Sequence, residues 1–389
     1  MKILLVGDYG VIHTRRYLDL ILKAGCDVVF LNSGPRELQI SEIPAENCYS
    51  WPRSGRSLAP YLLGAKLANK LGESLVQLQL RLLWAKIRPD ITHVQWIDER
   101  AWLIGKAGMS PLILNAWGSD LNLTRDPSHD PELLRRKTEV IAQAALLIAD
   151  SQDMVEIANN LTMTTVPSTL LPIGIDTKLF RPGQKAEASG QRRELGIPET
   201  AKVVLSPRAF RQTYGHDIIL RAFARAVRTM NMDAYLVFKA YDCWDRSYID
   251  EITRLASKCE IHDRIRIIEE VHYQKLPIYY SMGDFSVNFP DMDAFPVTFL
   301  ESLACEVPVL TKRLPAYDSL GISPYLEFTD TTSETSLESG ISKMLSCVSG
   351  PRPDISRARA YVSENFDELV VAKSLAAAYR RVFSTSARH

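Results

Sequence analysis

The sequence lacks an excess of charge of either sign and any long apolar run. Its 389 residues contain 46 Lys and Arg against 46 Asp and Glu, a balance that argues against a general nucleic-acid binder. No uncharged apolar run approaches the ~18 residues of a membrane span. The apolar start, Met1 to Gly7, turns polar at Asp8 and is too short for a signal peptide. We therefore expect a cytoplasmic protein that binds no nucleic acid.

Cysteine is scarce and has no metal-binding pattern. The six cysteines include no CxxC pair and no ligand spacing with histidine, which favours buried free thiols in a reducing compartment. The sequence also contains no HExxH motif. It therefore predicts neither a metal site nor a resident cofactor.

Apolar, strand-like runs alternate with helical segments along most of the chain. The alternation begins with strands at 2–7 and 28–31 around a helix at 14–23, and it restarts after a polar stretch at 183–191 that has no apolar periodicity. Such alternation predicts doubly wound parallel sheets. In the second half the predicted elements are strands at 202–206, 234–239, 264–268 and 284–288, and helices at 216–230, 247–258 and 275–281. The predicted organisation is a first domain at 1–182, a linker at 183–200, a second domain at 201–364 and a terminal helix at 365–389.

Asp293 and Glu301 flank the most informative segment, which runs from Asp293 to Leu310. The first acid opens a loop, and the second lies eight positions later in an apolar, helix-forming run. A helix N-terminus binds phosphate through its free backbone N–H groups and its dipole, whereas carboxylates beside a phosphate site bind hydroxyls. The segment therefore predicts a sugar-nucleotide site.

The same segment resembles the Glu-x7-Glu motif of the retaining glycosyltransferases of family four. Asp293 stands at the first Glu of that motif, and the matching residues are Phe295, Thr298, Glu301, Ala304, Cys305, Pro308 and Val309. Ala294, Pro296 and Glu306 stand where the family has glycines. The resemblance implies an α/β protein with the GT-B fold, in which two Rossmann-like domains face each other across a cleft. It also implies a C-terminal helix that crosses back to the N-terminal domain.

Several donor-binding residues follow from this resemblance. It implies that Glu301 holds the ribose hydroxyls and Asp293 the hexose, while the diphosphate is held by the segment that contains Phe295, Val297 and Thr298. Arg208 matches the family's phosphate-binding Arg, whose guanidinium neutralises the leaving diphosphate.

The family's second cation is missing, because Tyr214 stands in place of its Lys. Lys239 ends a predicted strand and is the expected substitute, since carboxyl ends of parallel strands line ligand clefts. Arg211 is a further candidate. The alternative for Lys239 is an exposed lysine at a strand end with no ligand.

The first domain contributes four further candidates. Gly10, at the tip of the first strand-to-helix turn, allows the backbone to approach a ligand closely. His13 is predicted to face the cleft near the diphosphate or the acceptor, or else to be structural. Trp117 replaces a family His and is either a sugar-stacking residue or a core aromatic. Asp120 is either a ligand or base for the acceptor hydroxyl or a helix N-cap.

Residues 53–88 are predicted to form a long helix with an apolar stripe beside a basic one. The stripe consists of Leu67, Leu71, Leu75, Leu78 and Leu82, and the basic side chains beside it are Lys66, Lys70, Arg81 and Arg88. This pattern suits peripheral contact with the anionic inner face of the cell membrane. The alternative is the solvated face of a core helix.

Together these patterns predict an enzyme that moves a hexose-type sugar from a UDP- or GDP-sugar to an acceptor hydroxyl with retention. Arg208, Asp293 and Asp120 are the predicted catalytic residues. Metal binding at Asp291-Met-Asp293 is disfavoured, because Asp293 occupies the position of a sugar-binding acid. The acceptor is a glycan, a lipid-linked sugar or a small molecule, which points to glycan, glycolipid or polysaccharide biosynthesis.

Two alternatives stay open. Trp117, Tyr214 and Pro296 depart from the family pattern and favour a catalytically degenerate protein that binds a sugar nucleotide without turnover. A hydrolysing sugar-nucleotide epimerase shares the fold, although the pattern from Asp293 to Leu310 disfavours it.

Overall fold

The computed structural model describes residues 1–34, 40–52, 65–126, 128–240, 245–269, 271–346 and 354–386, with the backbone alone for 65–68. Its contacts divide the chain into two compact units. The first contains Met1–Ile173 and Leu369–His389, and the second contains Gly174–Glu368. Each unit is built around one parallel sheet.

Over the described residues, the sheet of the first unit has seven strands in the order β3-β2-β1-β4-β5-β6-β7, all parallel. Apart from the more polar β4, its inner strands are near-continuous apolar runs, because helices cover both faces of the sheet. Its strands are β1 (Lys2–Gly7), β2 (Asp27–Asn32), β3 (Cys48–Ser50), β4 (Ile91–Gln95), β5 (Leu112–Asn115), β6 (Leu146–Ala149) and β7 (Ser168–Leu170).

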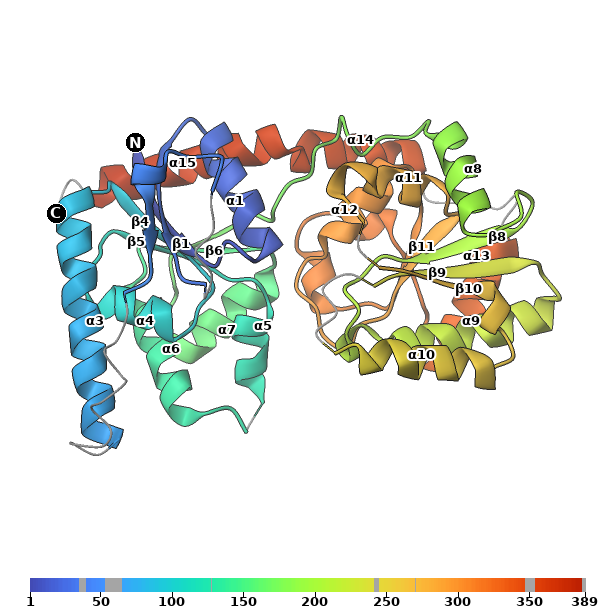
Figure 1. Ribbon diagram of the computed structural model, residues 1–389, viewed down its shortest axis with the longest axis horizontal. Helices are drawn as coiled ribbons and strands as arrows, with labels where there is room; N and C mark the ends of the chain where they lie inside the picture. Colours follow the sequence, from blue (N-terminus) through green and yellow to red (C-terminus); the bar gives the residue numbers. More distant parts are fainter. Residues whose placement is uncertain are drawn as a thin grey trace. The chain divides into compact units, whose positions relative to one another are not determined.

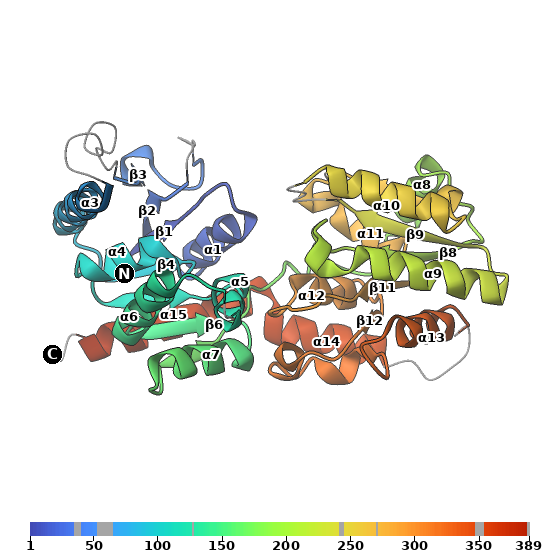
Figure 2. The ribbon, with the colours of Figure 1, turned by 90° about the horizontal axis from the view of Figure 1, so that it is seen from below.

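Of the helices that the structure describes in this unit, two cover one face of the sheet and the others cover the opposite face (Figures 1 and 2). The first pair is α1 (Ile12–Lys23) and α15 (Glu368–Ser386). The opposite layer contains α3 (Ala65–Ile87), α4 (Glu99–Lys106), α6 (Pro131–Gln143) and α7 (Gln152–Thr162), with the short α5 (Ser119–Asn122) beside α7. Residues 53–64 of the predicted long helix lie outside the described residues, as do the side chains of Lys66 and Leu67.

The C-terminal helix α15 packs on the first unit, as the family resemblance implies. The Tyr379 hydroxyl lies 2.7 Å from Nδ1 of His93 on β4. Val371, Leu375 and Val382 of the same helix are buried. The end of the chain is therefore part of the core of the domain with which the chain begins.

The sheet of the second unit has six strands in the order β10-β9-β8-β11-β12-β13, again all parallel. One layer of helices contains α8, α11, α12 and α14, and the other contains α9, α10 and α13 (Figure 1). The strands are β8 (Lys202–Ser206), β9 (Ala234–Lys239), β10 (Ile265–Ile268), β11 (Phe285–Asn288), β12 (Val309–Thr311) and β13 (Glu327–Phe328). The helices are α8 (Lys185–Glu194), α9 (His216–Met230), α10 (Ser247–Lys258), α11 (Leu276–Ser281), α12 (Val297–Ala304), α13 (Glu334–Ser346) and α14 (Ile355–Phe366).

The predicted linker at 183–200 is instead part of the second unit. It contains α8, which buries Ala188. Arg192 of this helix donates hydrogen bonds to the carbonyl oxygens of Met282 and Ala201. Because side-chain bonds to backbone anchor α8, its sequence needs little apolar periodicity and resembles a linker. The chain passes between the units at Ile173–Gly174 rather than after Pro182.

Candidate functional site

The predicted donor-binding residues of the second unit gather at the carboxyl edge of its sheet. Arg208 follows β8, Lys239 ends β9, and Asp293 follows β11. These three strands are neighbours in the order β9-β8-β11. In open parallel sheets this edge is where ligands bind.

Arg208 and Asp293 form a buried ion pair. Nη2 of Arg208 lies 2.7 Å from Oδ1 of Asp293, and their side chains are 10% and 7% exposed. The Arg208 guanidinium also lies 4.2 Å from the centre of the Tyr214 ring, a cation–π distance. Tyr214, which replaces the family's lysine, therefore adds no charge but helps to fix the orientation of Arg208.

The Asp293 carboxylate has two further donors. The Tyr317 hydroxyl donates to Oδ2 at 2.9 Å, and the Ala294 amide donates to Oδ1 at 3.1 Å. Burial raises the pKa of Asp293, and the Arg208 charge and these hydrogen bonds oppose that rise. Tyr317 was missed by sequence analysis, because it lies 24 positions away in a turn that carries no motif.

Glu301 lies in the second turn of α12 and is also buried. Its Oε2 accepts a hydrogen bond of 2.8 Å from the Tyr280 hydroxyl on α11. The structure thus joins Arg208 directly to Asp293, whereas Glu301 is fixed by a different partner. Phe295 stacks on Phe366 at 5.9 Å, so its ring belongs to the core.

Several buried polar atoms at this edge have no hydrogen-bond partner among the described residues. They are Oγ of Ser206, both amide atoms of Asn288, and Oγ1 of Thr298. Ser206 ends β8, Asn288 ends the adjacent β11, and Thr298 lies in the first turn of α12. Buried polar groups are almost always paired, so this edge has unused hydrogen-bonding capacity suited to a polar ligand.

Two lysines lie at the same edge of the sheet, at the ends of strands that are separated by β8 and β11. Lys239 is partly exposed at the end of β9. Lys312, which sequence analysis missed, directly follows β12, and its side chain is only 7% exposed. Its Nζ lies 3.4 Å from Oδ1 of Asp291 and 4.9 Å from the centre of the Phe289 ring. The rule that selected Lys239, a lysine at the end of a predicted strand, could also have found Lys312.

The first unit brings His13 and Trp117 together. Their rings stack with centres 4.8 Å apart and an interplanar angle of 21°. The Trp117 Nε1–H donates to Oε1 of Gln95 at 3.1 Å. Both rings are partly exposed, and the Gly10 amide, donating to Oδ1 of Asp8 at 2.8 Å, closes the turn before His13.

A chain of polar side chains continues from Trp117 into the core. Nε2 of Gln95 lies 3.2 Å from Nε2 of His93, and Nδ1 of His93 lies 2.7 Å from the Tyr379 hydroxyl. Burial lowers the pKa of His93 to about 3, so the ring is neutral near pH 7. The three polar residues Thr92, His93 and Gln95 in a buried strand of five were the available signal, and sequence analysis did not use it.

Asp120 joins two turns of the backbone. Its Oδ1 accepts from the Trp117 amide at 3.0 Å and its Oδ2 from the Ile97 amide at 3.1 Å. Burial raises its pKa to about 6. The N-cap alternative is wrong, because Gly118 occupies that position of α5. The acceptor-base role stays a prediction, while the observed contacts are those of a residue that positions Trp117.

Trp96 is a further exposed aromatic at this edge that sequence analysis missed. It follows β4 with φ +90°, and it is 37% exposed. Its amide donates to the Asn115 carbonyl at 3.2 Å. A positive φ is unfavourable for a bulky residue and is often found at functional sites. No local sequence signal indicates this conformation.

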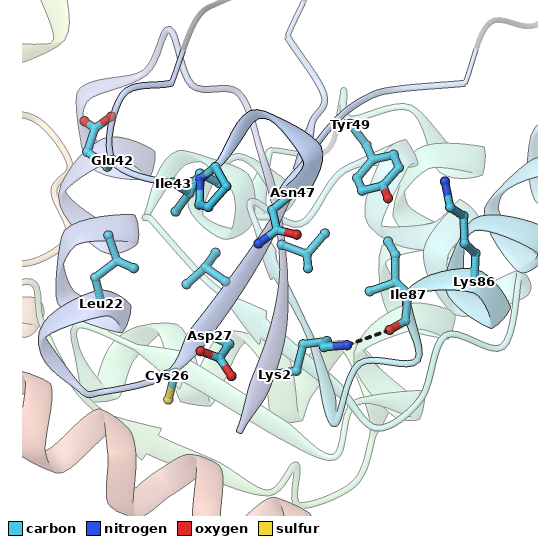
Figure 3. A pocket seen from close by; sticks show the side chains of 13 residues that line it. Lys2, Leu22, Cys26, Asp27, Glu42, Ile43, Asn47, Tyr49, Lys86 and Ile87 are labelled. Atoms are coloured by element: carbon cyan, nitrogen blue, oxygen red, sulfur yellow. Dashed lines mark hydrogen bonds between the residues drawn. The ribbon is translucent and has the colours of Figure 1, made fainter.

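A pocket of about 480 Å³ lies at the other end of the first sheet (Figure 3). Its lining includes Lys2 and Asp27, the first residues of β1 and β2, and Lys86 near the end of α3. His13 and Trp117 follow the carboxyl ends of their strands. The pocket is therefore separate from the candidate site.

Comparison with known families matches both halves of the chain. Residues 2–151 match the family described as "Glycosyl transferase 4-like", and residues 188–348 match "Glycosyl transferases group 1". A D-inositol 3-phosphate glycosyltransferase of Nocardiopsis dassonvillei is 24% identical over 265 residues, which are 63% of this chain and 61% of that protein. One from Corynebacterium jeikeium is 24% identical over 284 residues, covering 69% and 65%. The chain thus spans about three fifths of the length of these relatives.

Solved structures resemble the whole chain. A sucrose-phosphate synthase from Thermosynechococcus elongatus has a TM-score of 0.75 at 18% identity, covering 99% of this chain and 100% of that one. Anabaena Alr3699/HepE in complex with UDP-glucose has a TM-score of 0.75 at 16% identity, covering 98% and 99%. At this level of identity the likeness establishes the fold, two parallel-sheet α/β domains in one chain.

Proposed function

Because the chain belongs to the glycosyltransferases of GT-B fold, we propose that it transfers a hexose-type sugar from a UDP- or GDP-sugar to an acceptor hydroxyl with retention. The buried Arg208–Asp293 pair at the carboxyl edge of the second sheet carries this proposal. A fixed cation suits the departing diphosphate, and the adjacent carboxylate suits hexose hydroxyls. Glu301 is assigned to the ribose.

In the proposed reaction the acceptor oxygen bonds to the anomeric carbon on the face from which the diphosphate oxygen leaves. The acceptor proton passes to an oxygen of the leaving diphosphate, so no protein base is needed. Arg208 stabilises the charge that develops on that group, because its orientation is already fixed by Asp293 and Tyr214. The unpaired polar atoms of Ser206 and Thr298 support a phosphate-binding role for this edge.

The donor is proposed to be bound without metal or cofactor. Both acids of the Asp291-Met-Asp293 segment are engaged by cations, Asp291 by Lys312 and Asp293 by Arg208. The complex of Anabaena HepE with UDP-glucose supports a UDP-sugar over a GDP-sugar. Cytoplasmic location remains part of the proposal.

The acceptor is proposed to bind at the carboxyl edge of the first sheet. The His13–Trp117 stack offers a partly exposed aromatic face, which suits the apolar face of a sugar ring. Trp96 adds a second exposed indole after the neighbouring strand. A glycan or a lipid-linked sugar therefore fits better than a small acceptor without a ring.

The second cation is proposed to be Lys239 or Lys312. Lys239 ends β9, which pairs with β8, the strand that Arg208 follows in the chain. Lys312 is the more buried of the two lysines. A buried lysine is costly unless it meets an anion. Separate Lys239→Met and Lys312→Met variants decide between them. Substitution of the lysine that acts together with Arg208 should weaken binding of a nucleoside diphosphate by at least tenfold, because the site then loses one positive charge.

Purified protein tests the proposal with a panel of UDP- and GDP-sugars. We expect one donor to raise the melting temperature and to release nucleoside diphosphate when acceptor glycans are added. Arg208→Gln should abolish release, while Arg225→Gln should not. Arg225 is a matched control because it also forms ion pairs in the second unit, with Glu334 and Glu338 of α13.

The degenerate binding protein is the second candidate, favoured by Trp117 and Tyr214 in place of the family's His and Lys. A donor that raises the melting temperature but releases no nucleoside diphosphate with any acceptor would favour it over the enzyme. Release that persists in Arg208→Gln would refute the proposed role of the ion pair.

A further inference from the structure

Helix α3 carries apolar residues on two opposite sides. Its inner side contributes Val76, Leu80 and Ile87 to the core of the first unit. On its outer side four leucines, here called the leucine stripe, are 41–64% exposed: Leu71, Leu75, Leu78 and Leu82. Figures 1 and 2 show α3 at the margin of the unit, packed against α4 on one side. Isolated exposed leucines are ordinary, but an aligned group of four needs an explanation.

The leucine stripe is narrow and straight. Its members are separated by four, three and four residues, which places them within about 60° of arc on the helix surface. At 1.5 Å per residue the stripe extends about 16 Å along the axis. The core does not use this side of α3, so folding alone does not explain it.

The charged side chains beside the leucine stripe are all positive. Helical spacing places Lys70 and Arg81 along one border of the stripe and Lys86 along the other. Glu73, the only acid in the sequence of α3, points inward and pairs with Arg136 of α6 at 2.8 Å. The outer side of the helix therefore combines apolar and basic residues without an acid.

We propose that this side of α3 binds the surface of an anionic lipid bilayer. The leucine stripe would lie among the acyl chains, and the basic borders would meet the headgroup phosphates. Among the helices that the structure describes, none combines the length and apolarity of a membrane span, so the contact is peripheral, with α3 parallel to the surface. The inference does not depend on the proposed reaction.

A second copy of the chain fits this surface less well. Pairing two leucine stripes would bring Lys70 and Arg81 of both copies to the same seam, where no acid of α3 could pair with them. An anionic surface complements the same charges. Charge complementarity therefore selects the bilayer over self-association.

Flotation of the full-length protein with lipid vesicles tests the proposal. We expect binding to vesicles that contain phosphatidylglycerol, little binding to pure phosphatidylcholine, and weaker binding in 1 M than in 0.1 M NaCl. Lys70→Gln with Lys86→Gln should weaken binding about 30-fold. Leu78→Ser with Leu82→Ser should weaken it at least tenfold.

Matched substitutions elsewhere serve as controls. Leu369→Ser changes a leucine of α15 that is 47% exposed, and Lys178→Gln with Lys258→Gln removes two exposed charges of the second unit. Neither should alter vesicle binding, and circular dichroism should be unchanged in every variant.

Absence of binding to anionic vesicles overturns the proposal, as does an equal loss of binding in the controls. A dimer in sedimentation that Leu78→Ser with Leu82→Ser dissociates, without vesicle binding, would show a second copy instead. Because no nucleotide sugar is present, failure here leaves the proposed reaction untouched.

Discussion

In the second unit Arg208 is held between the Asp293 carboxylate and the Tyr214 ring, whereas in the first unit Trp117 is held between the His13 ring and the Gln95 amide. The first arrangement is ionic and almost fully buried. The second is neutral and partly exposed. Both fix a planar side chain at the carboxyl edge of a parallel sheet.

This difference determines how each group should respond to substitution. Removing one member of a buried ion pair leaves an uncompensated charge in the interior, which is strongly unfavourable. The hydrogen-bonded residues Trp117, Gln95, His93 and Tyr379 form what is here called the neutral chain. Removing one member of it leaves an unpaired dipole, which costs less free energy than an unpaired charge. The second unit should therefore be the more sensitive of the two, in activity and in stability.

After the loss of release in Arg208→Gln, the largest effect is expected for Asp293→Asn. Asn keeps the shape of Asp293 but removes the charge that orients Arg208 and would bind the hexose, so kcat/KM for transfer should fall about 1000-fold, equivalent to about 4 kcal/mol. Asp217→Asn is the control, because Asp217 also pairs with an arginine, Arg221, on the surface of α9. A loss below tenfold would mean that the ion pair is structural only.

The next effect concerns His216, which is buried among Phe210, Phe238 and Tyr248. Burial lowers its pKa to about 3, below the value near 6.5 of an unfolded chain. Its contribution to stability is therefore present above pH 6.5 and is lost as the pH falls from 6.5 toward 3. Relative to His216→Phe, the wild type should lose about 2 kcal/mol of unfolding free energy between pH 7 and pH 5.

Urea titration of both proteins at the two pH values measures this difference. Comparing wild type with variant cancels the opposing contribution of Asp120 and Asp293, whose pKa values are raised by burial. An unchanged difference between pH 7 and pH 5 would show that His216 is hydrated or charged in the folded protein.

Much of the secondary structure of the second unit could be predicted from its sequence. Strands 202–206 and 234–239 and helices 216–230 and 247–258 have the predicted bounds, because each is amphipathic or apolar over its whole length. The pairing of Arg208 with Asp293 was also within reach, since both residues follow adjacent strands of a familiar motif. Such positions are encoded locally.

The features that could not be predicted from the sequence depend on contacts between distant segments. Tyr317 reaches Asp293 from a turn beyond β12, and the positive φ of Trp96 is stabilised by a bond from the Ile97 amide to Asp120. Neither contact produces a periodic or compositional pattern in the sequence. The helix α8 was misread as part of a linker for the same reason, because the bonds of Arg192 to distant carbonyls replace apolar periodicity.

A smaller effect is expected in the first unit for Trp117→Phe. Phe keeps a ring beside His13 but loses the hydrogen bond to Gln95 and part of the stacking surface. We expect the KM for the acceptor to rise about tenfold, equivalent to about 1.4 kcal/mol, with the KM for the donor unchanged. Steady-state kinetics with each substrate varied in turn separates the two constants. A rise in the donor KM alone would instead place Trp117 against the donor sugar.

The smallest effect is expected for Tyr379→Phe, which removes one hydroxyl from the neutral chain. Nδ1 of His93 then loses its partner at 2.7 Å, and the free energy of unfolding should fall by about 1 kcal/mol. Activity should be nearly unchanged, because Trp117 keeps its own bond to Gln95. Tyr361→Phe is the matched control, since the Tyr361 hydroxyl donates to the Leu320 carbonyl in the second unit. If the acceptor KM also rose in Tyr379→Phe and not in the control, the chain from α15 to Trp117 would be a positioning device rather than a structural one.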